Sequence, residues 1–128
     1  MSTWDIEIFS REANTDFLDE LATLDDEDIV EAVEDSCKLV LSSTKLSAEE
    51  QENGLCAATI AAIWAGAPFS ASEVADEYPF LRELVGHISE ELSEAASAVL
   101  EAARDETEED SDLDIEPFIE ACLLYTSD

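Results

Sequence analysis

The sequence predicts an all-α fold, a small single-domain bundle of about five to six helices spanning residues 1–128. Apolar residues recur at spacings of three and four through most of the chain, which is the period of helices that bury one face. Hydrophobic residues make up 46% of the composition, so the chain is expected to fold rather than remain a disordered acidic tail. Only 3 glycines are present, too few for the many turns of an all-β domain.

The N-terminal residues 1–13 are predicted to form a short extended arm. Trp4, Ile6 and Ile8 alternate with polar residues, a period of two that is typical of extended backbone. The first helix should follow, capped by one of the polar residues at 14–16 (Asn14, Thr15 or Asp16). Its apolar side carries Phe17, Leu18, Leu21 and Leu24.

Two longer helices are predicted next. The second begins near Asp25 or Asp26, where acids favour the positive end of the helix dipole, and the polar run 42–44 ends it. Its apolar stripe consists of Ile29, Val30, Val33, Cys37, Val40 and Leu41. The third helix starts after Ser47, which forms a capping box with Glu50, and stops at Gly66. Because apolar residues surround more than one of its faces, this helix is expected to be the central core helix.

The second half of the chain contains further helix signals. Capping-box spacing at residues 70 and 73 predicts a short helix around Val74, which ends at Tyr78 before a proline. Residues 79–87 allow one or two more turns, and a long helix capped by Ser89 follows. Residues 105–114 are predicted to be an acidic interhelical loop. The apolar segment 115–124 then predicts a C-terminal helix with Pro117 in its first turn.

The charge of the chain restricts its partners. There are 34 acidic residues against 5 basic ones, a formal net charge of -29. Phosphate contacts need Lys and Arg, so direct binding to nucleic acid is not expected, and an anionic membrane surface is disfavoured for the same reason. A basic protein partner fits this surface. The alternative is that the charge serves only solubility, and the even spread of acids along the chain favours that alternative.

No constellation in the sequence indicates catalysis, a metal or a cofactor. Cys37, Cys56 and Cys122 lack metal-ligand spacing and lie on apolar helical patterns, so they are predicted to be buried side chains in a reducing compartment. No basic segment precedes an apolar one at the N-terminus, which predicts a cytoplasmic protein. His87 is the single histidine, and a cysteine–histidine nucleophile pair is not expected. The Asp110-x-Asp-x-Asp spacing resembles a calcium loop, but the required glycine and final glutamate are missing.

Two groups of residues are candidates for binding a partner. The first is a pair of aromatic residues, Trp4 and Phe9, which form either part of the core or, if exposed, an apolar patch ringed by acids. The second is the acidic segment that precedes the last helix. Its candidate residues are Asp105, Glu106, Glu108, Glu109, Asp110, Asp112 and Asp114.

Several stretches resemble a known family. The opening Met-Ser-Thr-Trp-Asp-Ile, then Phe9, Asn14 and Asp-Phe-Leu-Asp-Glu-Leu at 16–21, are similar to the N-terminal signature of the bacterial domain of unknown function 4259. The alanine-rich stretch 57–68 and Asp-Ser-Asp-Leu at 110–113 are similar in the same order. Ser2 replaces the family's usual glycine, and residues 8–11 depart from its Pro-Phe-Asp-Asn part. The resemblance implies one complete domain and brings no activity or catalytic residue with it.

Three functional hypotheses follow from these observations. The leading one is a non-catalytic interaction module that binds a basic protein, as an immunity protein or a mimic of nucleic acid does. The second is a small hydrolase that uses carboxylates, with or without a metal, on facing helices. The third is an acid-rich cytoplasmic protein whose charge serves only solubility. The sequence leaves the oligomeric state open.

Overall fold

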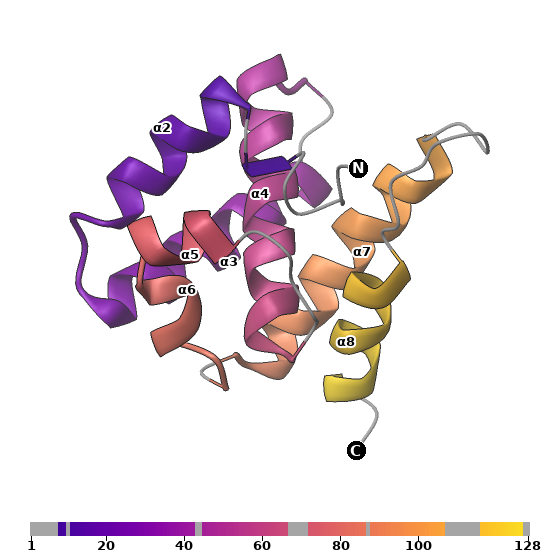
Figure 1. The fold of residues 1–128 in the computed structure, drawn as a ribbon. Coiled ribbons are helices and arrows are strands. Elements are labelled where there is room, and N and C mark those ends of the chain that lie inside the picture. Colours follow the sequence, from indigo (N-terminus) through magenta and orange to yellow (C-terminus); the bar gives the residue numbers. More distant parts are fainter. Residues whose placement is uncertain are drawn as a thin grey trace.

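The computed structural model describes residues 8–9, 11–42, 45–66, 72–86, 88–106 and 116–126. Regular secondary structure in these ranges is entirely helical, so the predicted all-α fold is confirmed. Figure 1 shows the arrangement of the helices. They are α2 (Glu12–Leu21), α3 (Asp26–Ser42), α4 (Ala48–Trp64), α5 (Ser72–Glu77), α6 (Phe80–Glu83), α7 (Glu90–Glu106) and α8 (Glu116–Thr126).

Helix α4 lies at the centre of the domain, as its apolar pattern predicts. It packs against α2, α3, α6, α7 and α8, and Figure 1 shows it between α2, α5 and α6 on one side and α7 and α8 on the other. Every residue from Cys56 to Trp64 is buried. Small residues permit this close packing, and at Gly54 a Cβ atom would lie 2.0 Å from Cγ2 of Val40 on α3. The close contact between α3 and α4 therefore requires a glycine at position 54.

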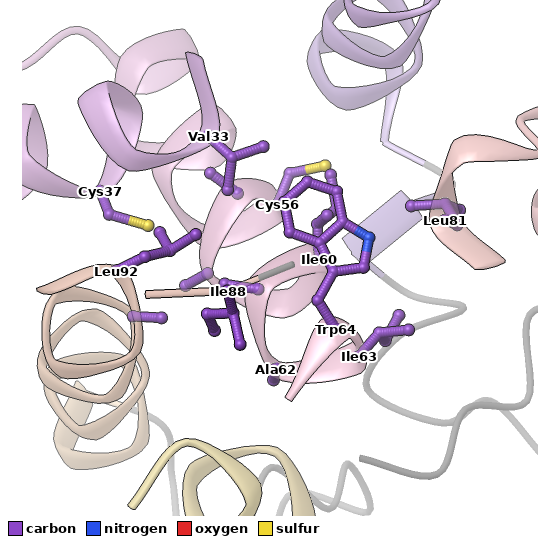
Figure 2. Packing of buried hydrophobic residues seen from close by; sticks show 14 of the residues in the cluster. Val33, Cys37, Cys56, Ile60, Ala62, Ile63, Trp64, Leu81, Ile88 and Leu92 are labelled. Carbon is purple, nitrogen blue, oxygen red and sulfur yellow. The ribbon is translucent and has the colours of Figure 1, made fainter. Parts of the chain in front are cut away.

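The core joins these helices through a few large side chains around α4. Figure 2 shows Val33 and Cys37 of α3, and Leu92 of α7, reaching toward the same part of α4. The indole Nε1 of Trp64 donates a hydrogen bond to the carbonyl oxygen of Phe80 at 3.3 Å. This contact attaches the end of α4 to the short helix α6.

The N-terminal part of the domain differs from the predicted extended arm of residues 1–13. Ile8 and Phe9 are helical, and α2 has already begun at Glu12, so the prediction is wrong at residues 8, 9, 12 and 13, whereas the cap residue Arg11 is extended. The side chain of Asn14, predicted as a candidate cap, is buried and donates to the carbonyl of Ile8 at 2.8 Å. This bond stabilises the turn into α2. Residues 1–7 lie outside the described ranges.

Most of the other predicted helix boundaries are confirmed. Ser47 caps α4 with the full capping box, in which its hydroxyl and the Glu50 side chain each accept a backbone N–H. The Ser89 hydroxyl accepts the backbone N–H of Leu92 at 3.1 Å and so caps α7. Gly66 follows the end of α4 with φ 111°, the left-handed region that favours glycine.

Two leucines that were assigned to apolar stripes are exposed instead. Leu24 is 39% exposed because α2 ends at Leu21 and the chain turns before α3 begins. Leu41 is 48% exposed in the last turn of α3. In this turn it is Val40 that lies against α4, beside Gly54.

The acidic loop predicted at 105–114 begins later than expected. Asp105 and Glu106 belong to the last turn of α7, and residues 107–115 lie outside the described ranges. An ion pair of 3.0 Å joins Nη1 of Arg104 to Oε1 of Glu116, so the end of α7 lies beside the start of α8. Arg104, in the last turn of α7, is favourable at the negative end of the helix dipole.

Candidate functional site

The structure places the predicted partner-binding residues in different environments. Phe9 is 1% exposed and belongs to the core. Of the two alternatives for this residue, core packing is therefore correct and an exposed binding patch is not. Asp105 is at the surface, with a side chain 78% exposed. The side chain of Glu106 is not described. Trp4, Glu108, Glu109, Asp110, Asp112 and Asp114 lie outside the described residues.

Ion pairs join carboxylates to the side chains of Arg11, Lys38, Arg82 and Arg104. Arg11 pairs with Glu52 at 3.3 Å, and Arg82 pairs with Asp76 at 2.9 Å. Lys38 bridges Glu34 and Glu91, on α3 and α7. Arg104 pairs with Glu116, and this contact raises the pKa of its guanidinium. These partly exposed pairs are worth little individually, but they place most of the positive charge beside acids and leave the surface anionic.

The three cysteines are buried, as predicted. Burial raises the pKa of the Cys122 thiol to about 12 and those of Cys37 and Cys56 well above their ordinary value of 9.0. A thiolate, not a thiol, is the nucleophile and the metal ligand. The protonated, inaccessible thiols therefore suit packing in the core. His87, the single histidine, for which no pairing with a cysteine nucleophile was expected, lies outside the described residues.

A partly buried polar contact connects α2 to the turn between α5 and α6. The hydroxyl of Tyr78 donates a hydrogen bond to Oδ1 of Asp19. Burial, followed by this bond, raises the pKa of the tyrosine. The contact holds the chain that enters α6 against α2, and so fixes the position of Leu84 at the end of α6.

An open depression lies beside the start of α3. The sequence predicts at this place only acids that are favourable at the positive end of the helix dipole. The volume of the depression is about 380 Å³, and its described lining comprises Asp26, Glu27, Val30 and Leu84. A second hollow shares Asp26 and Glu27 and extends along residues 24–28. We call these two adjoining hollows, with lining residues Leu24, Asp25, Asp26, Glu27, Asp28, Val30 and Leu84, the α3 cleft.

The α3 cleft combines an apolar floor with an acidic rim. Leu84 is 2% exposed at its base and Val30 is half-buried, whereas Leu24 stands 39% exposed at the edge. The four carboxylates of residues 25–28 are all exposed. The signal in the sequence was the run Leu-Asp-Asp-Glu-Asp at 24–28. The run alone does not reveal that Leu84, the residue that follows α6, lines a hollow together with Asp26 and Glu27.

The described residues contain no group of three or more His, Cys, Asp or Glu side chains arranged to hold a metal ion. Among the same residues, no helix has both the length and the apolar character needed to cross a bilayer.

Comparison with known proteins places the chain in a family. Neither a curated protein nor a solved structure matches it. One family model matches residues 2–117, which include every element from α2 to α7 and the start of α8. The match covers most of the chain and agrees with the resemblance of its opening, alanine-rich and Asp-Ser-Asp-Leu stretches. The chain therefore belongs to the family described as a domain of unknown function (DUF4259).

Proposed function

We propose that this protein is a non-catalytic interaction module that binds a basic protein through its anionic surface. The observation that carries the proposal is the net charge of -29 together with the pairing of its few cations. Since Arg11, Lys38, Arg82 and Arg104 already contact carboxylates, most acids have no basic side chain of the chain to neutralise them. A partner that supplies Lys and Arg would relieve this excess of negative charge.

An excess of charge of this kind affects mainly the association rate and the selection among partners. Opposite potentials on two proteins accelerate their association, and like potentials exclude wrong partners. At physiological salt the screening length is about 8 Å, so acids on neighbouring helices act together over a basic surface. The buried, protonated thiols also support binding rather than nucleophilic chemistry.

The test is an affinity capture with two baits. The immobilised protein is exposed to a lysate of the source organism beside an unrelated folded protein of comparable net charge, and bound proteins are eluted with a salt gradient and identified by mass spectrometry. We expect a basic protein that is retained by this chain alone, in fixed stoichiometry, and elutes at moderate salt. If both baits retain the same abundant basic proteins in no fixed ratio, the charge serves only the solubility of the protein.

A quantitative measurement then follows on the captured partner. Its association rate should fall steeply with added salt, and its dissociation rate should change less. Asp105→Asn removes one exposed carboxylate from the predicted acidic segment and should slow association without altering the fold. An association rate that is independent of salt would contradict the electrostatic proposal.

A further inference from the structure

We propose that the α3 cleft is the docking point of that basic partner, and that it receives an apolar side chain flanked by Lys or Arg. This inference rests on the proposed function and adds to it the place and the kind of segment that binds. It combines two separate features of the cleft: an apolar floor beneath the surface and an uncompensated acidic rim around it.

The apolar floor indicates that charge is not the whole of the interaction. Leu84 and Val30 line one of the two hollows, and Leu24, with 39% of its surface exposed, lines the adjoining one. The volume of about 380 Å³ corresponds to roughly thirteen water molecules at about 30 Å³ each. An inserted aliphatic or aromatic side chain would displace such water and cover the exposed parts of Val30 and Leu24, which is favourable for apolar surface.

The rim selects the sign of the flanking residues. A helix N-terminus carries about half a positive charge and by itself would attract an anion. Four carboxylates, at residues 25–28, surround this end of α3, and they outweigh that half charge several-fold. None of the described lining residues is a cation. The cleft is therefore suited to Lys or Arg side chains beside the inserted apolar group.

The same charges disfavour other occupants. A second copy of this chain also carries a net charge of -29, so two copies meeting at this rim would repel each other at low salt. An anionic ligand would meet the same four carboxylates. A segment of a basic protein is the occupant whose charge complements the rim and whose apolar side chain covers the floor.

The test uses the full-length protein and two defined probes. The first probe is the acetylated, amidated peptide Lys-Arg-Leu-Lys-Arg, and the second replaces its leucine with alanine. Binding is followed by amide chemical shifts of the isotope-labelled protein at low ionic strength. We expect shifts centred on residues 24–30 and on Leu84, and an affinity about tenfold higher for the leucine peptide because its side chain is buried.

Two cleft variants, each with a matched control, locate the binding site. Leu24→Gln should reduce the advantage of the leucine peptide, whereas Leu39→Gln, which changes a leucine 41% exposed about 20 Å further along α3, should not. The pair Asp26→Asn and Glu27→Gln should weaken both peptides several-fold more than Glu90→Gln with Glu94→Gln. The second pair removes the same charge from exposed positions on α7.

Each outcome decides the inference. Shifts centred on the α3 cleft that depend on leucine and on Leu24 support it. Equal binding of the two peptides, shifts spread over many acids, equal effects of the two charge pairs, or no binding at all would overturn it. The proposed function is judged separately by the two-bait capture: a partner retained equally by the wild type and by Leu24→Gln would leave that function in place and refute the cleft as its docking point.

Discussion

Replacing Gly54 with alanine tests the packing of α3 against α4. In the interior of a helix this change ordinarily stabilises by about 1 kcal/mol, because glycine is the poorer helix former. Here the added Cβ would lie 2.0 Å from Cγ2 of Val40, and overpacking of a core costs about 1–3 kcal/mol. We therefore expect Gly54→Ala to lower the free energy of unfolding by about 1 kcal/mol, the opposite sign to the propensity effect.

Removing Cγ2 of Val40, the atom that the new Cβ would meet, tests whether this contact is the cause. Val40→Ala deletes Cγ2 and leaves a Cβ at 3.2 Å, a tight contact that a small shift relieves. In that background Gly54→Ala should become neutral or stabilise by up to about 1 kcal/mol. The four proteins are compared by urea unfolding followed by far-ultraviolet circular dichroism at fixed salt. The coupling energy of the double-mutant cycle should be about 1–3 kcal/mol.

Gly66→Ala serves as the control. Gly66 has φ 111° and no atom within 4 Å of an added Cβ, so its replacement should cost about 1–2 kcal/mol through backbone strain alone. That cost should be the same with and without Val40→Ala. If Gly54→Ala also has equal effects in both backgrounds, the contact with Val40 is not what requires glycine, and the steric argument is refuted.

Other perturbations test the charge, the thiols and the N-terminal turn. The melting temperature should rise with added salt, because screening weakens the repulsion among 29 net negative charges; an unchanged value from dilute to molar salt would contradict this. Stability should fall as the pH rises from about 9 toward 12, because the unfolded Cys122 thiol releases its proton near 9.0 while the folded one, whose pKa is about 12, retains it. Unfolding titrations of Cys122→Ala should show a smaller loss over that range, and an identical loss would sink the assignment. Thiol reagents should modify the native protein only at the rate of its unfolding, since the cysteines are buried; rapid labelling would contradict this burial. Asn14→Ala should cost about 1–3 kcal/mol by removing the buried hydrogen bond from the Asn14 side-chain amide to the Ile8 carbonyl, whereas Thr23→Ala, at an exposed hydroxyl, should change stability by less than about 0.5 kcal/mol in the same urea assay.

The helices were predictable from the sequence where local chemistry determines them. Ser47 and Ser89 accept backbone N–H groups within their own helix turns, so their capping role depends on neighbours in the sequence. The central position of α4 followed from apolar residues on several of its faces. In both cases the information lies within a single segment of the chain.

The errors arose where distant contacts decide the outcome. Asn14 was predicted as a cap, but α2 has already begun at Glu12 with Arg11 at the cap position, and the Asn14 amide donates to the Ile8 carbonyl in the preceding turn. Leu24 fitted the apolar spacing of α2, yet the helix ends before it. The α3 cleft could not be predicted, because Leu84 lies far beyond Val30 in the chain and lines the same hollow as Val30 only through the packing of α6.

The complete burial of α4 from Cys56 to Trp64 has a consequence for how the domain opens. A helix enclosed by α2, α3, α6, α7 and α8 cannot be exposed by releasing one neighbour, so amide protons in its middle should exchange with solvent only when the whole domain unfolds. Their exchange rates then report the global free energy of unfolding, and local openings at the edges leave them unchanged. Hydrogen exchange at α4 can thus serve as an internal standard against which partner-induced protection elsewhere is measured.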